Sequence, residues 1–430
     1  MSVLLPFLST YDPVGTSEGT LDPLGLYQIA DQLAVQLVPA VRERMQRVRF
    51  LTAIAVGSLV TEGLEDDPAQ RDASPYLVWE WLVAEALVRH GSVDYDLKGV
   101  AGRHMARRAI DQRGYLDARS YLKTPRIFGI HGVYKRLAVH LGLVNVHLGP
   151  GPNAERLADA WARGAGLGGW EGAKPTVDRW RGALRRSLAE RPPRTKAPSD
   201  VFKELAEAFA PAAAKARERK CLAEMLLSPG DKPLGALPQI WELQYGYDAV
   251  TFQEEDLHLQ LGRRQPGLRP LLDGIRNYEM FARNMQDAFD VLKVVAAVPD
   301  AAGFQVKEIV RDKEFKSAVQ RLNGRFDAAH RGLGEVGPSG TILQNAFLEK
   351  FRVFSEPLAA DVCAQALCDH HVQVQRKKSA DGKRPWFDVV GPGRIFVRHA
   401  FREPRRPVAP TQYLHEYRGR PIGRFRADLS

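Results

Sequence analysis

The residue types best able to bind a metal or carry catalysis gather near the end of one predicted helix. Cys363 and Cys368 precede Asp369, His370 and His371, and thiolates together with imidazoles are ligands that zinc prefers. The cysteines are five positions apart, so on a helix their side chains point about 140° away from each other. The spacing therefore favours two buried cysteines and a helix-terminal pair of histidines over a metal site. No metal and no other cofactor is expected.

Asp369, His370 and His371 also resemble the start of an HNH nuclease motif, in which a histidine beside a strand activates water. The motif then needs an asparagine and a second histidine shortly downstream. No asparagine follows Asn345, and the next histidine is His399. A metal-dependent nuclease that uses the His370/His371 region stays an alternative. No catalytic residue is assigned, and a protein that is not an enzyme is favoured.

Several other catalytic signatures are absent. The chain has no Gly-x4-Gly-Lys-Ser/Thr phosphate loop, no Gly-x-Ser-x-Gly elbow and no His-Glu-x-x-His pair. The acidic run 253–258 has neighbouring carboxylates but no lysine spaced for a metal-dependent nuclease, and is interpreted as a solvated turn or helix start.

Charge is the most informative property of the sequence. The formal net charge is +10, from 61 Lys and Arg against 51 Asp and Glu. Three windows concentrate the cations: 98–150 has ten basic and two acidic residues, 174–196 has eight and two, and 370–430 has fourteen and five. The rest of the chain is acidic. Such segregation is typical of a protein that binds a polyanion, although an arginine-rich proteome encoded by a GC-rich genome would have a similar composition.

Composition excludes several classes of protein. With 430 residues, 44% hydrophobic and 26% charged, the chain can bury a core and is neither disordered nor collagenous. Three cysteines are too few for a disulfide scaffold. No run of 18 apolar residues predicts a membrane span, and the apolar start Met1–Leu8 lacks the basic region of a signal peptide. A cytoplasmic protein without a membrane partner is expected.

Helical periodicity runs through most of the chain, so the expected fold is mainly α and multi-domain. The predicted organisation is an N-terminal helical segment 1–74, a basic domain 75–190, a proline-rich linker 191–198, a helical domain 199–371, and a basic β-meander with a tail at 372–430. The meander is predicted from strands at 372–375, 383–390 and 394–398, separated by turns. Prolines in the tail after residue 402 argue against a core role there.

The order of elements between residues 75 and 165 resembles a winged helix-turn-helix module. Helices are predicted at 75–90, 100–112 and 127–141, followed by a short strand at 143–148, a Gly-Pro turn at 149–152 and a helix at 154–163. The resemblance implies that 127–141 is a recognition helix that enters the major groove of DNA. The turn carries no Lys or Arg, which departs from many wings. The alternatives are a solvated basic helix face within a helical domain and a winged helix that binds protein.

The candidate DNA-binding residues follow from this resemblance and from a second basic cluster. Those in the winged-helix-like part are Arg107, Arg108, Arg126, His131, Lys135, Arg136 and His140. Lys383 and Arg384 precede Trp386 and Phe387, and such interleaving can bind phosphates and stack bases, although aromatic residues in a strand more often belong to a core.

The expected function is binding of double-stranded DNA by a non-catalytic subunit of a prokaryotic DNA-directed system, of the antiviral-defence or mobile-element kind. Other protein subunits are a further class of partner. The remaining alternative is an interaction scaffold, in which the acidic helical middle of the chain docks a partner.

Overall fold

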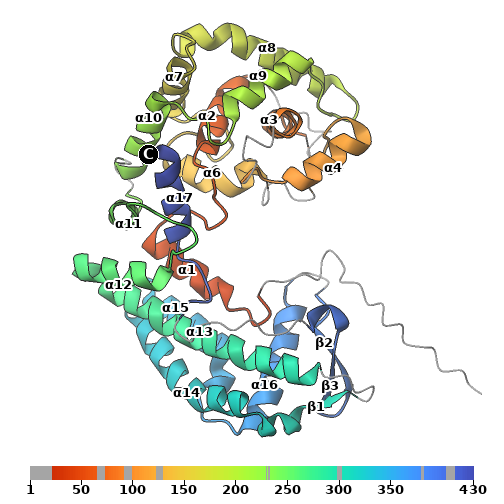
Figure 1. The fold of residues 1–430 in the computed structure, drawn as a ribbon, viewed down its shortest axis with the longest axis vertical. Helices are drawn as coiled ribbons and strands as arrows, with labels where there is room; N and C mark the ends of the chain where they lie inside the picture. The colour runs from red at the N-terminus through yellow and green to blue at the C-terminus, as the bar shows by residue number, and fades with distance from the viewer. Residues whose placement is uncertain are drawn as a thin grey trace, which may run out of the picture. The chain divides into compact units, whose positions relative to one another are not determined.

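The computed structural model describes residues 22–64, 73–91, 99–122, 129–228, 230, 233–297, 303–378, 382–402 and 412–430. Within these ranges the chain divides into two compact units (Figure 1). Unit 1 takes the described residues of Met1–Ala34 and Gln253–Glu416, and unit 2 takes those of Val35–Phe252 and Tyr417–Ser430. Neither unit is therefore a continuous stretch of sequence.

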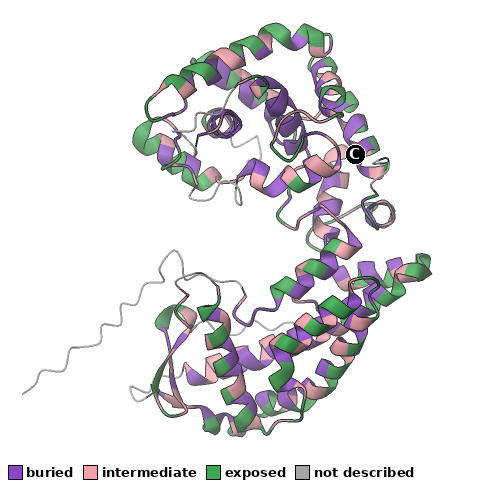
Figure 2. Ribbon diagram, turned by 180° about the vertical axis from the view of Figure 1, so that it is seen from behind, coloured by how far each residue is buried: buried purple, intermediate pink, exposed green. Residues whose placement is uncertain are grey.

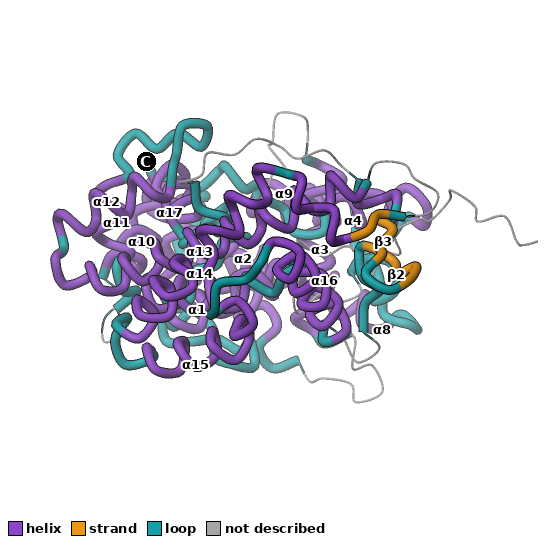
Figure 3. The backbone as a smooth tube through the Cα atoms, turned by 90° about the horizontal axis from the view of Figure 1, so that it is seen from below, coloured by secondary structure: helices purple, strands orange, loops and turns teal. Residues whose placement is uncertain are grey.

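Helices dominate both units, which confirms the mainly α prediction (Figure 3). The strands form one small antiparallel sheet. No helix in the described ranges is both long enough and apolar enough to cross a membrane.

Unit 2 is built from helices around two apolar ones. The first helix, α1 (Tyr27–Leu37), begins in unit 1 and ends in unit 2. The other helices of unit 2 are α2 (Phe50–Thr61), α3 (Pro75–His90), α4 (Arg103–Arg113), α6 (Ile130–His140), α7 (Ala154–Gly164), α8 (Trp170–Ala189), α9 (Ser199–Phe209), α10 (Ala216–Leu227), α11 (Leu237–Leu243) and α17 (Gly419–Leu429).

The core of unit 2 surrounds α2 and α3. Residues 50–60 of α2 and 75–88 of α3 are all buried (Figure 2), as expected for helices that are apolar all round. Trp79, Trp161, Trp180 and Phe209 pack together, with Trp180 and Phe209 each less than 6 Å from the other three ring centroids. Gly57 admits this cluster, because a Cβ there would lie 2.2 Å from Nε1 of Trp79.

The segment 191–198, predicted as a linker between domains, lies inside unit 2. Its Thr195 is buried, donates its backbone amide to the Leu116 carbonyl at 2.9 Å, and bonds through its hydroxyl to the buried Glu85. The proline-rich composition predicted a stiff linker, but a stiff segment can also pack inside a domain. The predicted domain boundary is therefore wrong.

Unit 1 contains a long helical hairpin and a three-stranded sheet. Its elements after α1 are α12 (Glu254–Arg264), η2 (Pro266–Leu268), α13 (Arg269–Ala296), β1 (Phe304–Gln305), η3 (Val306–Arg311), α14 (Lys313–Gly334), α15 (Gly340–Phe351), η4 (Arg352–Phe354), α16 (Ala360–Arg376), β2 (Phe387–Gly391), β3 (Arg394–Val397) and η5 (His399–Phe401). Phe281 of α13 meets Phe326 of α14 and Phe347 and Phe351 of α15 in the core.

The sheet corrects the predicted meander. Its strand order is β1-β3-β2, with both pairs antiparallel. β2 and β3 match the second and third predicted strands, but residues 372–375 continue α16 instead of forming the first. The third strand of the sheet comes from Phe304 and Gln305, which pair with Ile395 and Arg394.

The carboxyl-terminal tail also departs from expectation. Residues 403–411 lie outside the described ranges, but α17 follows and packs within unit 2. Tyr417, Ile422 and Phe425 are each 0% exposed. The end of the chain is therefore part of a core and not a dispensable basic extension.

Candidate nucleic-acid interface

Most of the predicted DNA-binding residues lie on two helices of unit 2, α4 and α6: Arg107, Arg108, His131, Lys135, Arg136 and His140. Lys383 and Arg384 belong to unit 1. Arg126 lies outside the described residues. The structure thus brings the α4 and α6 residues into one unit and leaves the second predicted cluster in the other.

The outer face of α4 is strongly cationic. The buried residues of α4 are Ala106 and Ala109, while Arg107 and Arg108, two of the predicted DNA-binding residues, are exposed. Neither guanidinium forms a hydrogen bond or ion pair with another residue that the structure describes. Two alanines therefore pack the helix against unit 2, and Arg107 and Arg108 are available to an external anion.

Three of the four candidates on α6 share its outer face. Arg136 is exposed and Lys135 and His140 are half-buried, whereas Val133 and Leu137 are buried on the inner face. At 100° per residue the three cationic positions fall within an arc of about 140°. Within the described ranges, the side chains of Lys135 and Arg136 have no hydrogen-bond or ion-pair partner.

His131, predicted to be exposed on that face, is buried instead. Its Nδ1 lies 2.6 Å from Oε2 of Glu80, a buried carboxylate on α3. Glu80 also accepts the backbone amides of Ile130 at 3.0 Å and His131 at 2.9 Å. A carboxylate at a helix start satisfies amides that have no partner within the helix. His131 therefore holds the first turn of α6 and is not a DNA contact.

The wing of the predicted module is not formed as a strand. In the described segment 141–153, an isolated bridge joins Val144 to Pro150. The side-chain oxygen of Asn145 accepts the amides of His147 and Gly149, which closes a tight turn. The resemblance to a winged helix therefore rests on the order of the helices alone.

A cavity of about 500 Å³ lies between α4 and α6. Arg44, Arg103 and His104 line it, and none of its described lining residues is Asp or Glu. Tyr134 of α6 forms one wall, and its hydroxyl accepts two backbone amides of the segment before α2, at 2.8 and 2.9 Å. The cavity extends the cationic surface of α4.

Most cations of the window 174–196 are used within unit 2. Four of them pair with carboxylates: Lys174 with Glu171, Arg179 with Glu204, and both Arg194 and Lys196 with Glu190. Arg181 donates to the carbonyl groups at the end of α2. Arg185 and Arg186 of α8 are exposed and form no pair with a described residue.

The predicted second cluster is largely structural. Arg384 donates to Asp388 of β2 at 2.8 Å, so its charge is neutralised locally. Lys383 is half-buried, and its backbone amide donates to the carbonyl of a residue in α16. Trp386 stacks on Phe401 with ring centroids 4.9 Å apart, which covers a face that base stacking would need.

The two cysteines belong to the buried face of α16. Cys363 and Cys368 are free and buried, and burial raises the pKa of each thiol to about 12. No group of three or more potential metal ligands occurs among the residues that the structure describes. Both side chains pack as small apolar groups.

The two histidines hold the chain near the start of unit 1. Nδ1 of His371 lies 2.9 Å from the Pro23 carbonyl, and its Nε2 accepts the Trp386 amide at 3.0 Å. Burial lowers the pKa of His371 to about 4. Both ring nitrogens of His371 are thus engaged, so a nuclease site there gains no support.

These contacts belong to a larger set in unit 1 that satisfies five consecutive carbonyl groups. The carbonyls of residues 22–26 accept, in order, from Lys378, His371, His370, Lys350 and Tyr278. Side chains from α13, α15, α16 and the segment just after α16 therefore fix the segment before α1.

Sequence reasoning missed the buried carboxylates. Glu218 of α10 binds Arg49 through both oxygens, at 3.1 and 3.2 Å, and accepts the Thr52 hydroxyl at 2.7 Å. Glu279 of α13 accepts Nδ1 of His415 at 2.7 Å. The available signal was a carboxylate inside an apolar run, as at 79–81, because a charge there requires a buried partner.

A glycine-rich segment after α7 also has the spacing of a dinucleotide-binding loop, at Gly164, Gly166 and Gly169. The segment follows a helix and not a strand. Oδ1 of Asp159 accepts the Trp170 amide at 3.0 Å and occupies the first turn of α8, where a phosphate would bind. The spacing therefore carries no nucleotide site.

No protein-family model, curated protein or solved structure matches the chain.

Proposed function

We propose that unit 2 binds the phosphate backbone of double-stranded DNA. α4 makes the main contact, and α6 contributes a second one. The observation that carries the proposal is the state of Arg107 and Arg108. Both are exposed, and neither has a partner among the described residues. Most cations of the window 174–196, by contrast, form ion pairs with carboxylates or hydrogen bonds to carbonyl groups.

The arrangement supports contact with phosphates more than reading of bases. Phosphate contacts fix a protein on the duplex without carrying sequence information. Glu80 accepts the backbone amides at the N-terminus of α6. In a recognition helix the N-terminal residues usually contact the base edges, so in α6 this end is already bound within the protein. The cationic cavity lined by Arg44 and Arg103 offers a further place for a phosphate group. We therefore expect unit 2 to bind duplex DNA with little preference for its base sequence.

The test of the α4 contact is Arg107→Ala/Arg108→Ala, measured by fluorescence anisotropy with a labelled duplex. Each lost phosphate contact weakens binding, and we expect the Kd to rise at least tenfold. The matched control is Arg185→Ala/Arg186→Ala on α8, which removes the same charge from an exposed pair in the same unit. If the control weakens binding as much as the α4 variant, the attraction is general and the proposed surface is wrong.

A second variant tests α6. Lys135→Ala/Arg136→Ala removes two side chains that face away from Val133 and Leu137, so the stability should change by less than about 0.5 kcal/mol. We expect the wild-type Tm and at least tenfold weaker binding. Unchanged binding would mean that this face only keeps the surface solvated, and a large fall in Tm would mean that it is packed against another part of the chain.

A further inference from the structure

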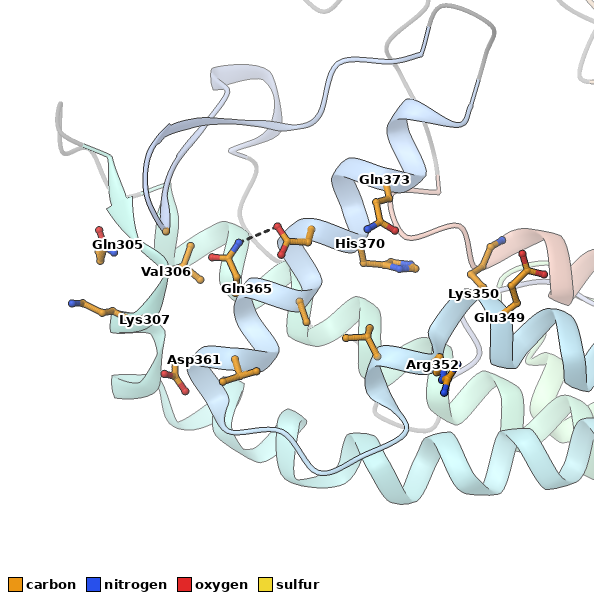
Figure 4. Close-up of a pocket in the computed structure, with 15 residues that line it drawn as sticks. Gln305, Val306, Lys307, Glu349, Lys350, Arg352, Asp361, Gln365, His370 and Gln373 are labelled. Carbon is orange, nitrogen blue, oxygen red and sulfur yellow. Dashed lines mark hydrogen bonds between the residues drawn. The ribbon is translucent and has the colours of Figure 1, made fainter.

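A groove in unit 1 runs along α16 and is unrelated to the cationic surface of unit 2. Its main cavity has a volume of about 650 Å³ and is lined by α16, by the end of α15 with η4, and by β1 with η3 (Figure 4). A smaller cavity of about 260 Å³ adjoins it at Lys350, His370 and Gln373 and continues along α16 toward α1.

α16 presents a regular ladder of polar side chains to this groove. Asp361, Gln365, Asp369 and Gln373 are all exposed, and all line the main cavity. They are four residues apart, which on a helix gives a repeat of about 6 Å. Gln365 donates to Asp369 at 3.0 Å, and no other side-chain hydrogen bond joins the ladder to a described residue.

The walls of the groove are fixed in place. Lys350 donates to the Gly25 carbonyl at 2.8 Å, and Nε2 of His370 lies 2.9 Å from the Leu24 carbonyl. Behind the ladder, Cys363 and Leu367 are fully buried. A preformed site spends less binding energy on ordering its own side chains.

The lining narrows the class of ligand. The described residues around the main cavity include no Phe, Tyr or Trp, the rings on which nucleic-acid bases stack. They offer carboxylates and carboxamides on α16, and the cations Lys307 and Arg352 on the other walls. Carboxamides both donate and accept, as a peptide backbone does.

The repeat of the ladder matches an extended polypeptide. Two residues of an extended chain span about 6.6 Å, close to the step of about 6 Å along α16. We propose that the groove binds an extended polypeptide segment whose basic side chains, four residues apart, meet Asp361 and Asp369. Gln365 and Gln373 then pair with the backbone of the segment, and Lys307 and Arg352 face its carbonyl groups.

The probe is a fluorescein-labelled decapeptide with arginine at its third and seventh positions and serine or threonine elsewhere. Its two arginines lie on one face of an extended chain. A second decapeptide has arginine at the third and sixth positions, which places them on opposite faces. Anisotropy with the full chain should give saturable binding of the first peptide and at least fivefold weaker binding of the second. Equal affinities, or no saturable binding, would overturn the proposal.

Variants then locate the site. Asp361→Asn/Asp369→Asn should weaken binding of the first peptide at least fivefold and leave duplex binding unchanged, which separates this proposal from the proposed function. The control, Asp327→Asn/Glu335→Gln, removes the same charge from exposed positions at α14 and should have less than a twofold effect. If the control weakens peptide binding as much as the α16 variant, the groove is not the site.

Discussion

Acidification tests the role of His371, because its burial holds the ring neutral. The folded chain lowers the pKa of His371 from 6.5 to about 4. The unfolded chain therefore takes up a proton near pH 6.5, whereas the folded chain does so only near pH 4. The contribution of neutral His371 to the free energy of unfolding is complete above pH 6.5 and is lost as the pH falls toward 4. At 1.36 kcal/mol per pH unit the whole loss is about 3.4 kcal/mol, of which about 2.5 kcal/mol has occurred by pH 4.5.

The assay is urea unfolding followed by circular dichroism at pH 7.5 and pH 4.5. His371→Gln keeps a group that can donate and accept but does not titrate, so its loss of stability between the two pH values should be about 2.5 kcal/mol smaller than that of the wild type. Burial also lowers the pKa of His258 and His370. Both residues remain in the variant, so the comparison isolates the part of the loss that requires His371. His399→Gln, at an exposed position, is the control. An equal loss in His371→Gln and wild type would refute the reasoning.

Three further substitutions test the packing. Glu80→Ala leaves buried donors unpaired at the start of α6 and should cost about 1–3 kcal/mol in urea unfolding; a cost below about 1 kcal/mol would mean that the donors find other partners. Gly57→Ala places a methyl 2.2 Å from the Trp79 ring and should lower the Tm by overpacking, at about 1–3 kcal/mol. Phe425→Ala should cost about 3–5 kcal/mol, and a wild-type Tm would return the tail to the dispensable role predicted from its prolines.

Local sequence pattern was sufficient for most helices. The predicted helix 75–90 has the same bounds as α3, because a proline at its first position and a glycine after its end mark both limits. The exposure that a DNA contact requires is found at Arg107 and Arg108, two of the predicted DNA-binding residues, but not at His131. His131 lies at the edge of the buried face of α6, and it is buried because it pairs with Glu80. Glu80 lies about fifty residues away in the sequence, so the local pattern could not reveal this partner.

The strand error has a similar cause. Residues 372–375 alternate Val and Gln, a strand pattern, but Gln375 is buried in α16 and donates to the Pro23 carbonyl. The true third strand has two residues, too few to show any alternation. Tertiary contacts decided both elements.

The charge windows of the sequence were the poorest guide to which cations are unpaired in the folded protein. The window 174–196 counts eight cations in sequence, but the count does not show which carboxylates fold back onto them, as Glu190 and Glu204 do. The window containing α4 differs because Arg107 and Arg108 form no ion pair with a described carboxylate.

The central claim is that free cations of α4 and α6 meet DNA phosphates, and a salt series on a labelled duplex tests it most directly. Four contacts, from Arg107, Arg108, Lys135 and Arg136, predict that log K falls with log salt at a slope of about −3.6. Affinity should then drop about 150-fold between about 50 and 200 mM salt, and Arg107→Ala/Arg108→Ala should reduce the slope to about −1.8. A binding constant indifferent to salt, or a variant with the slope of the wild type, would contradict the account.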